Sequence, residues 1–165
     1  MNEQVVVVGV DGSPASYTAL RRALSYAGRT GARVCALRCW TPILARGWEA
    51  AVTAEPVPSH AEQEARAARE LAEVVAAAQV RVPKGSRRVA VQQKVAHGTA
   101  GPALVAEAAG ADLLVVGHTP RSISGRLHRS VSWYCAQHAT CPVLVIPPAM
   151  AAQRTLFPVS AEIPA

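Results

Sequence analysis

The stretch "QVVVVGVDGSPAS", residues 4–16, decides the fold because a buried strand runs directly into the start of a helix. Its apolar residues follow one another without alternation, which is typical of a strand covered on both faces in a parallel sheet. Pro14 suits the first turn of a helix, and an apolar stripe continues on one helix face through residues 19–27. Gly31 is a natural helix end, and "RVCALRCW", residues 33–40, is a second strand. These elements form a βαβ unit.

The rest of the chain continues this alternation of strands and helices. Ser59 and Glu62 have capping-box spacing at the start of a helix that is expected to reach about Gln79. The remaining expected elements are a long loop at 41–59, strands at 87–96, 111–117 and 143–146, and helices at 98–110 and 130–138. The third strand alternates between apolar and polar residues, as an edge strand does.

Five strands alternating with four helices predict one doubly wound α/β domain. The expected sheet is parallel and flavodoxin-like, with strand order 3-2-1-4-5 and helices on both faces. The domain is expected to span residues 1–148, followed by a flexible tail at 149–165.

This strand order predicts a ligand crevice where the carboxyl ends of the first and fourth strands lie side by side. Asp11 follows the first strand, and its carboxylate has two interpretations. It accepts hydrogen bonds from a ribose hydroxyl or an adenine amino group, or it caps the following helix together with Ser13. Gly117 ends the fourth strand and suits a backbone that approaches a ligand closely.

The loop that follows the fourth strand carries the groups of an anion site. Backbone N–H groups and serine hydroxyls at residues 130–132 stand at a helix N-terminus, where phosphate binds well, although a plain N-cap is the alternative. Arginines in the loop add fork-shaped donors that suit phosphate. The predicted nucleotide-binding residues are Asp11, Gly117, His118, Arg121, Gly125, Arg129, Ser130, Val131 and Ser132.

Composition limits the class of protein. The chain has 165 residues, of which 50% are hydrophobic and 17% charged, and this size and balance suit one folded domain. The net charge of +6 is concentrated partly at 81–88, a solvated turn, and partly in the loop after the fourth strand. Aromatic residues do not alternate with basic ones, so no nucleic-acid partner is expected. Because no signal peptide and no apolar run of ~20 residues occurs, a cytoplasmic location without a membrane anchor is expected.

Cysteine and histidine positions predict neither a disulfide nor a metal centre. Cys35 and Cys39 share a strand with their Cα atoms roughly 13 Å apart, too far for a disulfide bond. No histidine stands at metal-ligand spacing from another histidine or a cysteine, so no metal is expected. Neither a G-x-S-x-G elbow nor a G-x-x-x-x-G-K-[ST] loop occurs, so the sequence predicts no catalytic residues and no enzyme.

Four pieces of the chain, in this order, resemble the universal stress protein family: "VVVVGVDGSPAS" (5–16), "VAHGTAGPALVAEAAGADLLVVG" (95–117), "RSVSWYC" (129–135) and "ATCPVLVIP" (139–147). The resemblance implies a cytosolic α/β domain produced under stress or growth arrest. It also implies a homodimer that pairs through the last strand, here Val143, Leu144, Val145 and Ile146. One branch of the family binds ATP through Gly-x2-Gly-x9-Gly-Ser/Thr together with the Asp after the first strand, and another branch does not bind it.

This chain matches that ATP pattern only at its ends. Gly117, Ser130 and Asp11 fit, but Pro120 and Arg129 stand at the other two glycine positions. Eight residues separate them where the pattern has nine. Proline lacks an N–H and fixes φ, and arginine places a side chain where the backbone should approach a phosphate.

Three functions follow from the resemblance and these departures. The leading expectation is a non-catalytic stress-response regulator that binds ATP or another adenine nucleotide, such as AMP, in the crevice. The first alternative is a dimeric interaction module that binds an unknown protein partner and no nucleotide. The second is a slow ATP hydrolase, which ranks last because no general base or carboxylate cluster stands near the loop.

Overall fold

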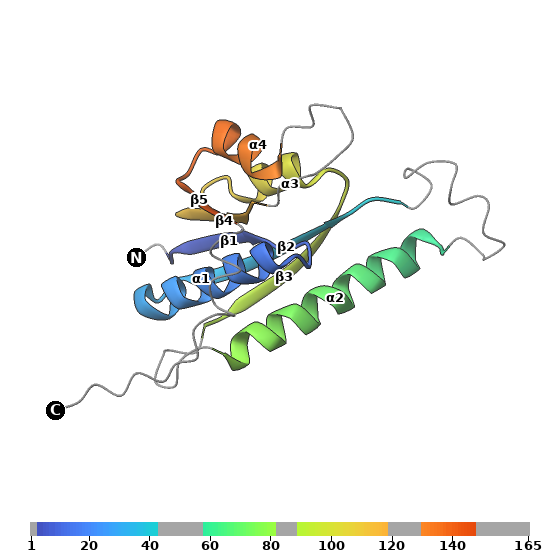
Figure 1. Cartoon of the computed structure of the whole chain (residues 1–165), viewed down its shortest axis with the longest axis horizontal. Coiled ribbons are helices and arrows are strands. Elements are labelled where there is room, and N and C mark those ends of the chain that lie inside the picture. The colour runs from blue at the N-terminus through green and yellow to red at the C-terminus, as the bar shows by residue number, and fades with distance from the viewer. Residues whose placement is uncertain (1–2, 43–57, 82–88, 119–129, 148–165) are drawn as a thin grey trace.

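The computed structural model describes residues 3–42, 58–81, 89–118 and 130–147. Within them the chain forms a five-stranded parallel sheet in the order β3-β2-β1-β4-β5, with helices on both faces (Figure 1). The elements are β1 (Val5–Gly9), α1 (Pro14–Thr30), β2 (Arg33–Trp40), α2 (His60–Val80), β3 (Val91–His97), α3 (Ala100–Glu107), β4 (Leu113–Gly117), α4 (Val131–His138) and β5 (Val143–Ile146). The predicted doubly wound fold and strand order are confirmed.

The central strand β1 explains the unbroken apolar run that opens the chain. Val7 pairs with Cys35 of β2 on one side and with Leu114 of β4 on the other. Val6, Val7 and Val8 are all fully buried. Alternate residues of β1 therefore face two different helix layers, and neither face tolerates a polar side chain.

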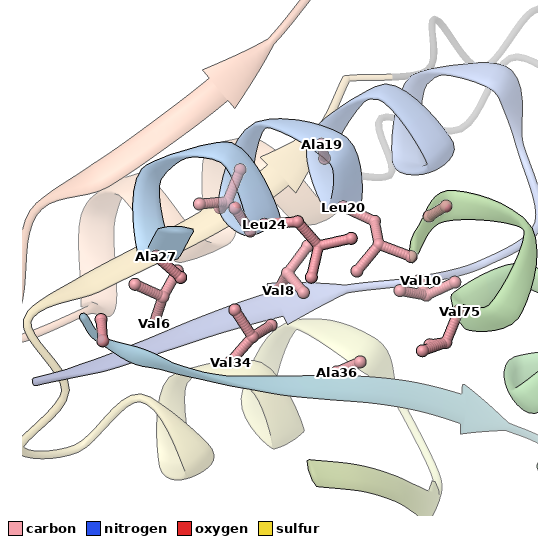
Figure 2. Packing of buried hydrophobic residues seen from close by; sticks show 14 of the residues in the cluster. Val6, Val8, Val10, Ala19, Leu20, Leu24, Ala27, Val34, Ala36 and Val75 are labelled. Atoms are coloured by element: carbon pink, nitrogen blue, oxygen red, sulfur yellow. The ribbon is translucent and has the colours of Figure 1, made fainter. Parts of the chain in front are cut away.

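The core has two layers, one on each face of the sheet. α1 and α2 cover one face, where Leu20, Leu24 and Val75 pack against the strands (Figure 2). α3 and α4 cover the other face, where Leu104 and Cys135 pack against the strands. Complete burial of each large aliphatic side chain stabilises the fold by about 1.5–3 kcal/mol.

Local signals fix the ends of the helices. The Ser13 side chain caps the start of α1 by accepting a backbone N–H. Gly31, with φ of 81°, ends α1 by donating its N–H to the carbonyl oxygen of Ala27 at 2.8 Å. Ser59 and Glu62 form the predicted capping box at the start of α2, with both reciprocal hydrogen bonds present.

The two edge strands differ in character. β3, predicted at 87–96 and observed at Val91–His97, exposes the polar side chains of Gln92 and Gln93. β5 exposes apolar side chains instead, because Leu144 and Val145 are 42% and 37% exposed. A polar edge resists pairing with another chain, whereas the apolar side chains of β5 favour contact with a partner.

Several predicted features lie outside the described residues. They are most of the 41–59 loop (43–57), the basic turn at 82–88, the loop residues 119–129 with Arg121, Gly125 and Arg129, and the tail at 149–165. All four cysteines fall within the described ranges, and each is a free thiol there.

Candidate functional site

The carboxyl ends of β1 and β4 meet where the strand order predicts a crevice. Val8 pairs with Val115, so the loop that contains Asp11 lies beside the end of β4 at Gly117. A cavity of about 80 Å³, which we call the crevice cavity, lies at this place. Its walls come from strands β1, β2 and β4, from the connection after β1, and from helices α1, α3 and α4. The lining residues are Gly9, Val10, Asp11, Ser16, Leu37, Cys39, Ala100, Leu104, Val116, Gly117 and Val131.

Asp11 takes part in the cap of α1 and keeps an exposed carboxylate. Its Oδ1 accepts the backbone N–H of Ser13 at 2.8 Å, and its own N–H donates to Ser16 Oγ at 3.3 Å. Burial raises the pKa of the Asp11 carboxyl, but hydrogen bonds from Ser13 and Ser16 outweigh this effect and hold the pKa below its usual value. The carboxylate at the mouth of the crevice is therefore ionised at neutral pH.

Gly117 is required by packing inside the protein. A Cβ at this position would lie 2.7 Å from the backbone carbon of Ala15 and 2.7 Å from the backbone nitrogen of Ser16. The end of β4 therefore approaches the first turn of α1 more closely than any side chain would allow. The close backbone approach that the sequence predicts at this glycine is made to a helix.

The start of α4 is joined to the end of β4 by side-chain hydrogen bonds. His118 Nδ1 lies 2.9 Å from Ser132 Oγ, which lies 3.1 Å from Ser130 Oγ. Ser130 Oγ also accepts the backbone N–H of Trp133 at 3.2 Å, so Ser130 is the N-cap of α4. Both serine hydroxyls are thus already partnered, and the positive end of the α4 dipole faces this edge of the sheet.

The predicted site residues that the structure describes gather in two adjoining groups. Asp11, Gly117 and Val131 line the crevice cavity. His118, Ser130 and Ser132 form the hydrogen-bonded chain that connects β4 to α4. The predicted contributions of Arg121, Gly125 and Arg129 concern residues that the structure does not describe.

Sequence reasoning missed the apolar wall of the crevice cavity. Leu37 and Cys39 of β2 and Leu104 of α3 belong to this wall. The alternation of β2 was the available signal, because alternate residues of a strand face the same side of the sheet. α3 gives no such signal, since its contribution depends on how it packs against β1 and β2.

The described groups at this edge can donate and accept hydrogen bonds to a ligand. Burial raises the pKa of the Cys39 thiol, which makes it a poor nucleophile at neutral pH. Within 3–42, 58–81, 89–118 and 130–147, no three His, Cys, Asp or Glu side chains gather closely enough to hold a metal ion. Over the same residues, every helix is too short or too polar to span a bilayer.

Comparison with known proteins identifies the family. The model of the "Universal stress protein family" matches residues 3–147. A universal stress protein of Mycolicibacterium smegmatis is 37% identical over 149 residues, which is 87% of this chain and 45% of that protein. The chain belongs to the universal stress protein family. It spans about half the length of this curated relative.

Solved structures of the same family share the fold. A universal stress protein in complex with cAMP is 27% identical, with a TM-score of 0.59, and the match covers 89% of this chain and 98% of that one. UspA of Lactobacillus plantarum is 23% identical with a TM-score of 0.60, and 88% and 99% of the two chains are covered. A family member from Burkholderia pseudomallei is 24% identical with a TM-score of 0.58, covering 87% and 96% of the chains.

Proposed function

We propose that this protein is a non-catalytic, cytoplasmic regulator of the stress response that binds an adenine nucleotide in the crevice between β1 and β4. The observation that carries the proposal is the placement of an ionised carboxylate, Asp11, beside the N-terminus of α4 at one edge of the sheet. A likeness of 27% identity to a universal stress protein in complex with cAMP supports the same class of ligand. We take residues 1–148 as the domain that performs this role.

In the proposed complex, each part of the nucleotide meets a matching group. The Asp11 carboxylate accepts hydrogen bonds from the ribose hydroxyls, and the N-terminus of α4 at Val131 and Ser132 receives a phosphate. The purine contacts the apolar wall that includes Leu37 and Leu104. Arg121, Gly125 and Arg129 are assigned to the phosphate from the sequence pattern alone, as is His118.

The size of the crevice cavity limits the affinity. Its volume of about 80 Å³ is well below the roughly 300–1,000 Å³ of most small-molecule sites. A nucleotide therefore lies partly outside this cavity, across its mouth. We expect binding in the micromolar to millimolar range, with AMP and cAMP bound at least as well as ATP because Pro120 and Arg129 replace two glycines of the ATP pattern.

Isothermal titration calorimetry with cAMP, AMP, ADP and ATP tests this proposal. Asp11→Asn keeps an acceptor for the Ser13 N–H but removes the negative charge, and we expect affinity to fall about tenfold. Ser130→Ala removes the cap of α4 and is expected to weaken binding as well. The matched controls are Glu64→Gln on the exposed side of α2 and Ser25→Ala on α1. Unchanged affinity in both site variants would mean that the nucleotide binds elsewhere. No heat at millimolar nucleotide would contradict nucleotide binding and favour the alternative of a dimeric interaction module.

The absence of catalysis has its own test. Purified protein is incubated with ATP and magnesium, and phosphate release is compared with that of a heat-denatured sample. We expect no difference between them. Phosphate release that Asp11→Asn abolishes would instead establish a hydrolase.

One observation favours a second role as a dimeric interaction module. Leu144 and Val145 of β5 are 42% and 37% exposed, and an edge strand with apolar side chains favours pairing with a second copy. Sedimentation at micromolar concentration is expected to show a dimer that Leu144→Lys dissociates. Val80→Lys, at an apolar side chain that is 85% exposed at the end of α2, is the control and should leave the dimer intact. A wild-type monomer would remove this role.

A further inference from the structure

Three side chains link the end of β4 to the first turn of α4 by a continuous chain of hydrogen bonds. His118 Nδ1 lies 2.9 Å from Ser132 Oγ, which lies 3.1 Å from Ser130 Oγ. The chain ends on the helix backbone, because Ser130 Oγ accepts the N–H of Trp133 at 3.2 Å. Ser132, in the middle, is buried, whereas His118 and Ser130 are partly exposed. We call these three side chains the histidine–serine chain.

The sheet fixes the position of His118. Its backbone N–H donates to the carbonyl oxygen of Ile146 in β5 at 2.8 Å. The residue before it, Gly117, packs directly against the first turn of α1. A proton gained or lost by the His118 ring therefore acts on the histidine–serine chain while the backbone stays in place.

The direction of the histidine–serine chain depends on the proton at His118 Nδ1. A hydroxyl has one hydrogen to donate and two lone pairs that accept, and a neutral imidazole has one donor and one acceptor nitrogen. In neutral histidine the form with its hydrogen on Nε2 is the more stable tautomer. In that form Ser132 donates to Nδ1 and Ser130 donates to Ser132. Both hydroxyl hydrogens are then used inside the chain, and Ser130 has none left for a ligand.

A protonated His118 reverses this direction. Both nitrogens of a charged imidazole are donors, so Nδ1 donates to Ser132. Ser132 then donates to Ser130, its only other side-chain partner among the residues that the structure describes. Ser130 accepts from both Ser132 and Trp133, and its own hydrogen points out of the chain.

We propose that His118 is a positioning residue for the phosphate of the nucleotide, and that its protonation turns the Ser130 hydroxyl into a donor for that phosphate. This role rests on the proposed function, which assigns the phosphate to the N-terminus of α4 beside Ser130, where Val131 lines the crevice cavity. An anion at Ser130 and a charged His118 favour the same direction of the chain, so each strengthens the other. Histidine ordinarily changes charge between about pH 5 and 8, and the nucleotide therefore binds more tightly as the pH falls through this range.

The described elements around His118 carry few charged groups. β5 (Val143–Ile146) is wholly apolar, and the first turns of α1 and α4 contain no acidic residue. The titratable side chains of those two turns are Tyr17 and Tyr134, and phenols ordinarily keep their protons between about pH 5 and 8. In the described part of this edge, the carboxylate that lines the crevice cavity is that of Asp11.

The loop after His118 adds further charged groups. It carries His128 and three arginines, which lie outside the described residues: Arg121, Arg126 and Arg129. Arginine stays charged at all of these pH values, so His128 is the member of this loop that could add a pH dependence of its own. A variant of His128 is therefore a necessary control.

Calorimetry with cAMP over a pH series tests this role on the full chain. cAMP suits the test because its phosphodiester keeps one negative charge throughout, whereas a phosphate monoester such as AMP takes up a proton at about pH 6. We expect cAMP to bind about tenfold more tightly at about pH 5.5 than at about pH 8, as the gain of one hydrogen bond to a charged group predicts. Adenosine, which lacks the phosphate, should show no such change.

Two variants separate the histidine–serine chain from simple attraction between charges. His118→Gln removes the titrating group and should make cAMP binding independent of pH. Ser132→Ala keeps the imidazole but interrupts the chain, and it should also lose most of the pH dependence, whereas attraction through space would survive. His128→Gln and His138→Gln are the controls and should keep the pH dependence; His138 bonds to the carbonyl oxygen of Tyr134 at 2.9 Å, away from the chain. Urea unfolding confirms that each variant folds.

Nitrogen NMR and a sulfate titration distinguish failure of this role from failure of nucleotide binding. In the ligand-free protein, His118 Nδ1 should be unprotonated at about pH 8 and protonated at about pH 5.5. Sulfate, which stays a dianion over this range, should also bind more tightly at the lower pH. Sulfate binding that follows pH without any cAMP binding would contradict nucleotide binding alone. Absence of binding of both anions, pH-independent binding of both, full pH dependence in Ser132→Ala, or its loss in His128→Gln would each overturn the role of His118.

Discussion

The crevice cavity and a larger cavity between the end of β2 and α2, which we call the β2–α2 cavity, lie at the same end of the sheet and share Cys39, but they differ in size and in what predicts them. The first measures about 80 Å³, and its polar side chains bond to one another or to nearby backbone, as Asp11 does with Ser13. The second measures about 310 Å³, and its charged side chains pair with one another, as Arg38 does with Glu70. Strand order predicts a ligand at the first cavity, whereas no pattern in the sequence predicts the second cavity. Volume and predicted position are therefore separate properties, because the larger cavity is not the one that the strand order marks for a ligand.

The largest expected effect tests whether tight packing holds the crevice. Gly117→Ala places a Cβ 2.7 Å from backbone atoms of Ala15 and Ser16, which cannot move without shifting α1. We expect the free energy of unfolding to fall by about 3 kcal/mol, the upper part of the usual cost of overpacking. Urea denaturation followed by circular dichroism measures this loss.

Gly101→Ala is the matched control for that substitution. Its Cβ would lie 2.8 Å from a ring carbon of Tyr134, a side chain that can rotate away. In addition, alanine is favoured over glycine inside a helix by about 1 kcal/mol. The loss at Gly101 should therefore be clearly smaller than at Gly117. Equal losses would mean that the crevice is no more tightly packed than the α3–α4 contact.

A medium effect is expected from the ion pair in the wall of the β2–α2 cavity. Arg38→Gln leaves Glu70 with Arg66 alone, and we expect unfolding free energy to fall by about 1 kcal/mol, a value limited by the partial exposure of Glu70. The double variant Arg38→Gln/Glu70→Gln should recover most of that loss. If the single and double variants were equally stable, Arg38 and Glu70 would not be coupled, and urea midpoints decide between the two results.

The smallest expected effect concerns how much Asp11 in the crevice and Glu70 on α2 each contribute to the loss of stability at low pH. Hydrogen bonding to Arg66, opposed by burial, holds the pKa of Glu70 below its usual value. Burial raises the pKa of Asp11, but hydrogen bonds from Ser13 and Ser16 hold it below its usual value as well. A carboxyl with a lowered folded-state pKa adds stability above its unfolded pKa and loses it as pH falls through the folded value. Asp11→Asn and Glu70→Gln should each lose less stability than the wild type between neutral pH and about pH 3. Urea midpoints over a pH series test this, with Glu64→Gln as control, and wild-type behaviour in both variants would contradict it.

The fold could be predicted because its signals are local. The uninterrupted valines of β1, the cap at Ser13 and the left-handed Gly31 are each visible in a few consecutive residues. Right-handed crossovers then leave few arrangements for five strands. The position of the crevice followed from strand order in the same way, and Asp11 and Gly117 do lie together there.

The structural role of each site residue could not be predicted, because it depends on contacts between elements that are far apart in the sequence. The sequence predicts that Gly117 faces a ligand, but the structure shows that the first turn of α1 packs against it and leaves no room for a Cβ. The link from His118 to Ser132 depends on the placement of α4 beside β4. The β2–α2 cavity could not be predicted from the sequence. Arg38 and Trp40 occupy ordinary alternating positions of a strand, and they line a cavity only because α2 packs beside them.

The four cysteines bear on how a protein of a stress family can sense its surroundings. Burial raises the pKa of every one of these thiols, to about 11 for Cys35 and Cys135. The thiolate is the form that attacks peroxides and alkylating reagents, and its fraction at neutral pH is then far below that of an ordinary cysteine. The folded chain is thus expected to react slowly with oxidants at these four sulfur atoms, and slow labelling of the native protein by a thiol reagent would be the corresponding observation.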